Sequence, residues 1–519
     1  MSILTRTSLT SVIGLCHLCF VCACAAPPKG EYFAIEVVDE STGRGVPMVE
    51  LETVNNLKFM TDSAGLAAFF EPGLMNQKLF FTVKSHGYEM EKDFLGFAGK
   101  QVDVTPGGSA SLKIKRLNIA QRIYRATGAG IYADSVLLGR EPPIKQPLLN
   151  AQVFGQDSVQ PAVYKGEIYW FWGDTNRPSY PLGNFHTTGA RSLLPEKGGL
   201  DPSVGINFDY FMNPDGFTKK MMPMPEDKPG PVWTDAVFTA KDSQGGEKLV
   251  GHFSRMKDIS QRLERGIMIF NDLKQEFESA ISVPLEEPLG PQGQAIDKKV
   301  IVDGVEHQYF CHWGPPNIRV KADLKSVLDV SQYEAFTPLQ PGVVFKGKET
   351  KLDRNKGQLV WAWKRGTGTL SGREQKELID AGLMTADESP YFLRNVDDGQ
   401  PVTLHSASVS YNAFRQKWIM IGLEIDGTSK LGEVWYAESA AIEGPWKWGK
   451  KVVTHNRYSF YNPRLHSFFD EQGGRIVYFE GTFANSISGT DSTTPRYEYN
   501  QIMYRLDLDD AGLKPLLAK

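Results

Sequence analysis

The sequence predicts an all-β protein, in which a small N-terminal β-sandwich is followed by a five-bladed β-propeller with a short helical insertion. Short apolar runs with a period of two, separated by Gly and Pro, fill residues 27–117 and are typical of a sandwich. From residue 151 to 519 a loose repeat of strand hairpins recurs in five units. Repeated units of three or four antiparallel strands are typical of propeller blades. An irregular pair of β-sandwiches is the alternative.

The composition restricts the class of protein. The 519 residues include 57 Lys and Arg against 61 Asp and Glu, and 41% are hydrophobic. The charge balance excludes a nucleic-acid binder driven by bulk positive charge, and the hydrophobic fraction excludes a disordered chain. We therefore expect a globular protein with large apolar cores.

Residues 1–26 are predicted to be a signal peptide. Arg6 is their only charged residue, an apolar run covers 12–25, and Ala23-Cys24-Ala25 offers small residues for cleavage. This predicts a secreted or periplasmic protein. The sequence around Cys24 also resembles a bacterial lipobox, which would place the protein at the cell surface on a lipid anchor. Cleavage leaves Cys311 alone, which excludes an intrachain disulfide and a four-thiolate zinc site.

Five strand-like runs form the predicted sandwich: 33–38, 48–51, 66–70, 79–83 and 110–114. The order of Val38-Asp39, Thr42-Gly43, Val46-Pro47, Thr61-Asp62, Ala64-Gly65 and Gly87-Tyr88 resembles the carboxypeptidase-regulatory, transthyretin-like sandwich. That resemblance implies an accessory module. Residues 118–150 read as a connector, in which 119–124 are predicted to form one or two helical turns before Pro142-Pro143.

The predicted propeller contains one segment that breaks the β pattern. Within residues 351–391, Ser371-Gly372-Arg373-Glu374 is a capping-box pattern and predicts a helical insertion ending near Gly382. Such an insertion either shapes one wall of a cleft or decorates the surface.

Polar residues at or before the first strand of different units are expected to converge on the central funnel of the propeller. Asp157, Asp235, His405 and Asn462 occupy such positions. Two carboxylates facing each other across a funnel are what glycoside hydrolysis requires, one ionised and one protonated. This arrangement predicts an enzyme that acts on a glycosidic bond.

Two motifs carry a family resemblance. Asp157 followed by 169–175, with Gly173-Asp174-Thr175, resembles the opening of the five-bladed propellers in the bacterial endo-D-arabinanase family. More loosely, Trp435-Tyr436-Ala437-Glu438-Ser439 followed by Gly444-Pro445-Trp446 is similar to glycoside hydrolase family 43. The resemblance implies a polysaccharide substrate that contains furanose or pentose sugars.

The sequence departs from family 43 in its acid. That family places a base, a tuning Asp and an acidic Glu on three successive blades, and the third unit here has no Glu in the matching strand. Asp157 fits the base or nucleophile and Asp235 the tuner, while Asp174, Glu424 and Glu480 remain candidates for the acid. Glu480 lies in an apolar strand and needs a partner, for which Arg464 or His466 is suited.

Aromatic and polar residues near these positions are candidates for binding the substrate. Trp172, Trp233, Trp313 and Tyr461 are expected either to stack on sugar rings or to pack between blades. The remaining substrate-binding candidates are Arg177, His312, His405, Asn462, Arg464 and His466.

No cofactor is expected. The spacings of zinc motifs are absent from the sequence. His252, His312, His405 and His466 fall in different units. They are either ordinary hydrogen-bonded histidines or hold Ca²⁺ in the central channel, as the resemblance implies for some relatives.

The sequence thus predicts an exported glycoside hydrolase whose partner is a polysaccharide or oligosaccharide, with no nucleic acid involved. The first alternative is a propeller that binds glycan or protein without catalysis, which the missing third-unit acid favours. A second is a polysaccharide lyase that uses Tyr461, His466 and Arg464. The arrangement of carboxylates in the funnel discriminates among them.

Overall fold

The computed structural model describes residues 30–184, 186–485, 488–489 and 498–519, and the protein is nearly all β. The predicted signal peptide, including Cys24, lies outside the described residues. Within the described ranges, no helix is long and apolar enough to cross a membrane.

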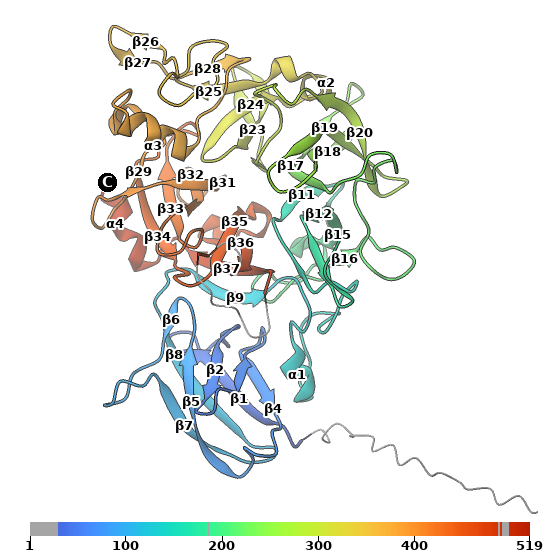
Figure 1. Ribbon diagram of the computed structural model, residues 1–519, viewed down its shortest axis with the longest axis vertical. Helices are drawn as coiled ribbons and strands as arrows, with labels where there is room; N and C mark the ends of the chain where they lie inside the picture. The colour runs from blue at the N-terminus through green and yellow to red at the C-terminus, as the bar shows by residue number, and fades with distance from the viewer. Residues whose placement is uncertain (1–29, 185, 486–487, 490–497) are drawn as a thin grey trace, which may run out of the picture.

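The N-terminal part contains two four-stranded sheets, drawn in blue at the bottom of Figure 1. One core joins them, with Val37, Leu51 and Phe81 at its centre. Each of the five predicted runs overlaps a strand. The sheets have the orders β4 (Leu66–Phe69), β1 (Phe33–Asp39), β8 (Ser109–Arg116), β6 (Tyr88–Glu89) and β3 (Lys58–Met60), β2 (Glu50–Thr53), β5 (Gln77–Lys84), β7 (Gly99–Val104).

The prediction of helical turns at 119–124 is wrong. This segment forms β9 (Gln121–Arg125), which pairs antiparallel with β37 (Asn500–Asp507), the last strand of the chain. Every residue of β9 is buried. The hydrogen bonds to β37 and the burial of Ile123 and Tyr124 outweigh a weak local preference for helix, because strand formation depends strongly on tertiary context. The short helix α1 (Ala133–Leu137) follows.

Five further sheets succeed one another along the described chain after β9. From the inner to the outer strand, the first is β11 (Gln160–Tyr164), β12 (Glu167–Trp172), β15 (Thr188–Leu193), β16 (Asp209–Tyr210), and the second is β17 (Val232–Lys241), β18 (Glu247–Met256), β19 (Arg262–Asn271), β20 (Glu276–Val283). The third is β21 (Gln294–Ala295), β23 (Val305–Cys311), β24 (Pro316–Lys321), β25 (Glu334–Thr337), β28 (Ala362–Arg365), with β22 (Val300–Val302) on β23. The fourth is β31 (Leu404–Asn412), β32 (Lys417–Glu424), β33 (Val434–Ser439), β34 (Trp448–Val453), β29 (Leu393–Asn395), β30 (Pro401–Val402). The fifth is β35 (Ser459–Leu465), β36 (Ile476–Ala484), β37, β9.

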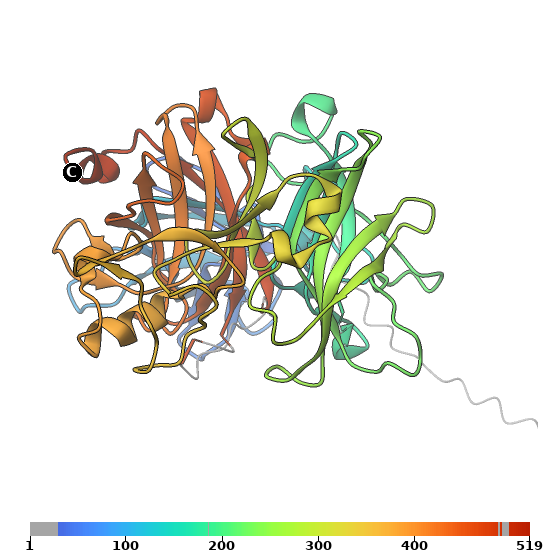
Figure 2. The same cartoon turned by 90° about the horizontal axis from the view of Figure 1, so that it is seen from above.

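These five sheets form a ring, because a separate hydrophobic core joins each sheet to the next and the fifth to the first. Phe171 and Phe253 belong to the core between the first two sheets, and Trp170 and Tyr478 belong to the core where the ring closes. Three other cores fill the remaining junctions. Figure 1 shows the sheets following one another around a common centre above the N-terminal sheets. In Figure 2 the green sheets and the orange to red sheets lie on opposite sides.

Smaller elements connect these sheets. A three-stranded sheet contains β10 (Gly155–Gln156), β13 (Thr175–Arg177) and β14 (Tyr180–Asn184), and a hairpin joins β26 (Arg354–Asn355) to β27 (Gln358–Leu359). The helices are α2 (Leu324–Val327), α3 (Gly372–Asp380) and α4 (Lys514–Leu517). Helix α3 begins as predicted, since the Ser371 hydroxyl accepts from the Glu374 N–H and the Glu374 carboxylate accepts from the Ser371 N–H.

Candidate active site

A left-handed residue lies just before the inner strand of the first sheet and within the inner strands of the second and fifth sheets. Ser158, Ala236 and Asn462 have φ values of 57°, 51° and 50°, and each directly follows a candidate residue. The register shifts in the second and fifth sheets begin at Asp235 and Tyr461. A β-bulge redirects the side chains beside it and is common next to active sites. The two bulges therefore redirect the side chains beside Asp235 and Tyr461.

Asp157 lies at the junction of the first and fifth sheets. The Tyr461 hydroxyl donates to its Oδ2 over 3.2 Å, and the Tyr499 hydroxyl also bonds to the carboxylate. Burial raises the pKa of Asp157, and these hydrogen bonds oppose that rise by stabilising the ionised form. Asn462 donates to the Ser158 hydroxyl over 2.8 Å and fixes the same junction.

Asp174 is the second carboxyl group at this place. The Gly173 N–H donates to the Asp157 carbonyl, and a Cβ on Gly173 would lie only 2.2 Å from Asp157 Oδ1. Because Gly173 has no side chain, the Asp157 carboxylate can lie against the backbone directly before Asp174. Burial, followed by the negative charge of Asp157, raises the pKa of Asp174 to about 7. The Trp233 indole donates to its Oδ1 over 2.8 Å.

Asp235 has a different environment although it lies only two residues after Trp233. Burial opposes its ionisation, but the neighbouring His252 ring and the Gly293 N–H together lower its pKa. His252 Nδ1 is 2.5 Å from Oδ1, and the Gly293 N–H donates to Oδ2 over 2.8 Å. Asp235 is therefore an ionised carboxylate with 37% of its side chain exposed.

Further candidates lie around a hollow between the third and fourth sheets. His312 and Trp313 follow β23, and the Trp313 ring packs edge-on against His405 of the fourth sheet, with centroids 5.2 Å apart. Glu424 ends β32 nearby, where it accepts from the Trp435 indole over 2.8 Å, and burial raises its pKa. Arg177 lies apart from these residues, over the Phe217 ring.

Trp172 does not fit a sugar-stacking role. Only 1% of its surface is exposed, and its ring stacks on Trp170 and meets Phe208 and Tyr210. Alternation along β12 turns Trp170 and Trp172 to the same side, which is the core between the first and fifth sheets. The packing interpretation therefore replaces the binding interpretation.

Glu480, His466 and Arg464 are also removed from the candidate site. Glu480 and His466 are fully buried and bond to each other, with 3.1 Å between Oε1 and Nε2. Arg464 is buried and binds the Ala295 carbonyl and the Asp297 carboxylate. These three side chains lie inside the fifth sheet and its junctions, where their burial separates them from any substrate. His466 is thus the partner that the sequence required for Glu480.

Several residues of the site were missed by the sequence analysis. Tyr499 and Gly293 contact the carboxylates from loops, and no local pattern marks them. The innermost strand of the third sheet, β21, has only two residues and was not identified. Thr369, Ser371 and Arg373 of the insertion line the hollow beside Trp313. The capping box located the helix but not the cavity that it borders.

No group of three or more His, Cys, Asp and Glu suited to a metal ion occurs among the described residues. Of the four histidines considered for Ca²⁺, His252 bonds to Asp235 and His466 to Glu480. Cys311 is a buried free thiol, and burial raises its pKa to about 12.

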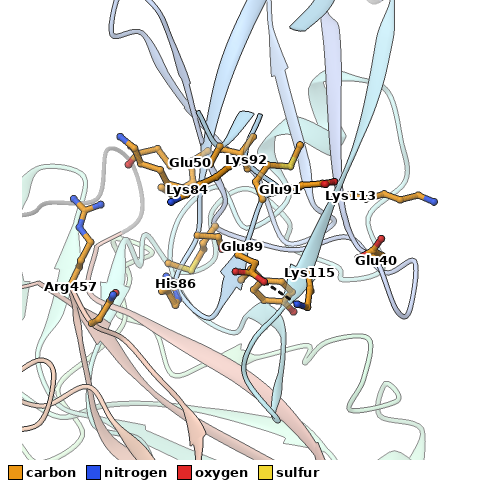
Figure 3. Close-up of a pocket in the computed structure, with 18 of the residues that line it drawn as sticks. Glu40, Glu50, Lys84, His86, Glu89, Glu91, Lys92, Lys113, Lys115 and Arg457 are labelled. Carbon is orange, nitrogen blue, oxygen red and sulfur yellow. Dashed lines mark ion pairs between the residues drawn. The ribbon is translucent and has the colours of Figure 1, made fainter. Parts of the chain in front are cut away.

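The cavity of about 950 Å³ shown in Figure 3 lies elsewhere, between the N-terminal sheets and the start of β35. Two of the acidic side chains in its lining are paired with lysines, Glu89 with Lys115 and Glu50 with Lys58 and Lys84. Carboxylates neutralised by lysines are poor acids and bases near neutral pH. Asp157 and Asp174 at the end of the ring are therefore the better candidates.

Comparison with known proteins gives distant structural likenesses. No protein-family model matches the sequence. No curated protein is similar to it. The solved structures that resemble it include an endo-arabinase from Bacteroides thetaiotaomicron, at 12% identity over 70% of this chain and 98% of that chain, with a TM-score of 0.33. A GH43_1 enzyme from Xanthomonas citri matches at 10% identity over 69% and 89%, with a TM-score of 0.33. An exo-beta-1,3-galactanase from Phanerochaete chrysosporium matches at 8% identity over 75% and 65%, with a TM-score of 0.37. At such scores the likeness carries no argument about activity.

Proposed function

We propose that the protein is a glycoside hydrolase in which Asp174 is the general acid and Asp157 is the base or nucleophile. The observation that carries this proposal is the contrast between the two neighbouring carboxyl groups. Asp157 receives hydrogen bonds from two tyrosines, whereas Asp174 has a pKa of about 7. Two adjacent carboxyl groups with unlike environments divide into one acid and one base.

In this mechanism Asp174 donates its proton to the glycosidic oxygen as the bond to the anomeric carbon breaks. The Asp157 carboxylate either removes a proton from the attacking water or forms a covalent bond to the anomeric carbon that water then hydrolyses. In both cases Tyr461 holds the carboxylate in place through its hydroxyl. The anomer of the fresh product distinguishes the two routes, because attack by water inverts and a covalent intermediate retains.

Trp233 and Asp235 support the acid. The Trp233 indole fixes Asp174 Oδ1, so the remaining carboxyl oxygen carries the proton. Asp235 stays ionised beside His252, two residues after Trp233, and we assign it the tuning role in this mechanism.

The wider assignment belongs to the same proposal. The five sheets joined by successive cores support a five-bladed propeller, and the two N-terminal sheets with one core support an accessory sandwich. We further propose that the protein is exported and acts on a polysaccharide that contains furanose or pentose sugars. A glycan-binding protein without catalysis is the competing function, since the innermost strand of the third sheet is Gln294–Ala295 and has no carboxylate.

The test is the release of reducing ends from a panel of plant, algal and bacterial polysaccharides. We expect Asp157→Asn and Asp174→Asn to abolish release with little change in Tm. Asp272→Asn is the matched control, because Asp272 lies on the surface in a pair with Lys165. Release that survives in Asp157→Asn would remove this residue from the mechanism. Absence of release with intact glycan binding would establish the binding function, and unsaturated products would indicate a lyase.

A further inference from the structure

The hollow beside Trp313 is a cavity of about 480 Å³ between the third and fourth sheets and the inserted segment. His312 and Trp313 supply one side, His405 a second, and Thr369 to Glu374 the side formed by the start of α3. The insertion is therefore part of the wall of a cavity and not only a surface decoration. A volume of this size accommodates a sugar ring.

Trp313 is held in this cavity as an exposed aromatic surface. About half of it, 49%, is exposed, and its backbone has a φ of 54°, a conformation that bulky residues rarely adopt. The ring lies edge-on to His405 at 5.2 Å and near His312 at 5.7 Å between centroids. A constrained and exposed indole presents its face to a ligand, and backbone strain of this kind concentrates at functional sites.

The polar groups around Trp313 are uncharged near neutral pH. Burial lowers the pKa of His312 to about 4, and burial together with the charge of Arg373 lowers the pKa of His405 to about 4. His312 Nδ1 lies 3.2 Å from the Thr369 hydroxyl. His405 Nδ1 has no hydrogen-bond partner among the described residues. Neutral imidazoles and hydroxyls both donate and accept, which suits the hydroxyl groups of a sugar.

The two charged side chains of the lining, Arg373 and Glu374, have opposite signs, so the lining has no net charge while its histidines are neutral. Arg373 also binds Asp426 over 3.1 Å, and the Glu374 carboxylate is held by the capping box of α3. An acidic sugar would bring a negative charge that this lining has no excess of positive charge to offset. The lining therefore favours a neutral sugar over a uronic acid or a sulfated sugar.

The cavity adjoins the carboxylates along the ring. His312 is next to Gly293, whose Cβ position would lie 3.1 Å from the His312 Cα, and the Gly293 N–H donates to Asp235. Two residues before Asp235, Trp233 binds Asp174. A polysaccharide chain cleaved at Asp174 can therefore continue past Asp235 toward Trp313.

We propose that the Trp313 cavity is a subsite that binds a neutral sugar residue away from the cleaved bond, so that the substrate class is an uncharged polymer. This inference rests on the proposed hydrolase function for its position in the cleft. Trp313 is a specificity-determining residue in this subsite. Its ring strengthens the binding of a chain that is long enough to reach it, but not the binding of a single glycoside.

Binding measured in the Asp157→Asn background tests the subsite without turnover. The probes are arabinan, arabinogalactan and xylan as neutral polymers and polygalacturonate and alginate as acidic ones, in affinity gel electrophoresis. We expect Trp313→Ala to weaken binding of a neutral polymer about tenfold, as the loss of one stacking contact predicts, and Trp313→Phe to retain most of it. Tm confirms the fold of both variants, and Phe94→Ala, which removes a 94% exposed aromatic side chain from the N-terminal part, is the matched control.

In the active protein, Trp313→Ala should lower kcat/KM on a long neutral oligosaccharide but not on a short aryl glycoside. Unchanged binding of every neutral polymer by Trp313→Ala, or binding of acidic polymers alone, would overturn the subsite. Loss of neutral polymer binding in Trp313→Ala, with no turnover by the parent, would sustain the subsite and refute the hydrolase.

Discussion

Asp174 and Glu480 are both carboxyl groups in apolar surroundings, yet the structure gives them opposite consequences. Glu480 is fully buried, and its Oε1 bonds to His466 inside the protein. Asp174 is half-buried and has another carboxyl group, Asp157, as its electrostatic neighbour. A buried acid with a basic partner stabilises a fold, whereas one beside a second acid holds a proton that it can donate.

The largest effect is expected when each of these two acids is replaced by its amide. Asp174→Asn should lower kcat/KM by about 10²–10⁴-fold, the usual contribution of a general acid, without loss of stability. Glu480→Gln should instead lower the free energy of unfolding by about 1–3 kcal/mol, because it weakens a buried hydrogen bond. Reducing-end assays and urea unfolding measure the two effects. A large activity loss in folded Glu480→Gln would reverse the assignment of the acid.

The pH dependence of activity tests the protonation of Asp174. The acid must carry its proton to act, and its pKa is about 7, so kcat/KM should fall roughly tenfold per pH unit above that value. A profile of kcat/KM between pH 4 and pH 9 measures this. A profile that stays flat above pH 7 would exclude Asp174 as the acid.

The same pKa predicts a change in stability with a definite sign. The folded protein holds the Asp174 proton more tightly than the unfolded chain, where the pKa is 3.8, so this group loses its stabilising effect as the pH rises to about 7. Asp174→Asn has no such loss. Its Tm relative to the parent should rise between pH 4 and pH 7 and level off above. A Tm difference independent of pH would contradict the raised pKa.

Gly173 offers a smaller perturbation of the same pair. A Cβ at this position would lie 2.2 Å from Asp157 Oδ1, so Gly173→Ala must displace the carboxylate. We expect a loss of about 1–3 kcal/mol in stability, typical of overpacking, and reduced activity at unchanged substrate binding. Gly73→Ala is the control, since its Cβ would meet only the end of the Glu71 side chain at 3.9 Å. Activity equal to the parent would show that Asp157 tolerates displacement.

The sequence anticipated the parts of this site that follow from local pattern. Alternating runs located β1 and β17, and the capping box located α3. Hydrophobic alternation and helix caps can be recognised from a few neighbouring residues. Asp157, Asp174 and Asp235 were selected because each lies at or near a predicted strand that begins or ends at the funnel. A position beside the funnel was not enough for Trp172, since its burial depends on the sheet that packs against it.

Contacts between distant segments could not be predicted in this way. The pairing of β9 with β37 joins segments separated by most of the chain, and local sequence at 119–124 favoured a helix. Tyr499 reaches Asp157 from a loop on the other side of the ring closure. Neither contact leaves a periodic pattern in the sequence, because each depends on how distant segments meet in the folded ring.

The smallest expected effect concerns the cavity of Figure 3, where Glu89 and Glu50 have lysine partners. Glu89→Gln breaks an ion pair whose two side chains are 49% and 67% exposed, so solvent already screens most of the attraction. We expect a loss below about 1 kcal/mol in urea unfolding and no change in kcat/KM. A measurable fall in kcat/KM would show that this cavity takes part in the reaction. Pairing with a lysine would then not exclude a carboxylate from the active site.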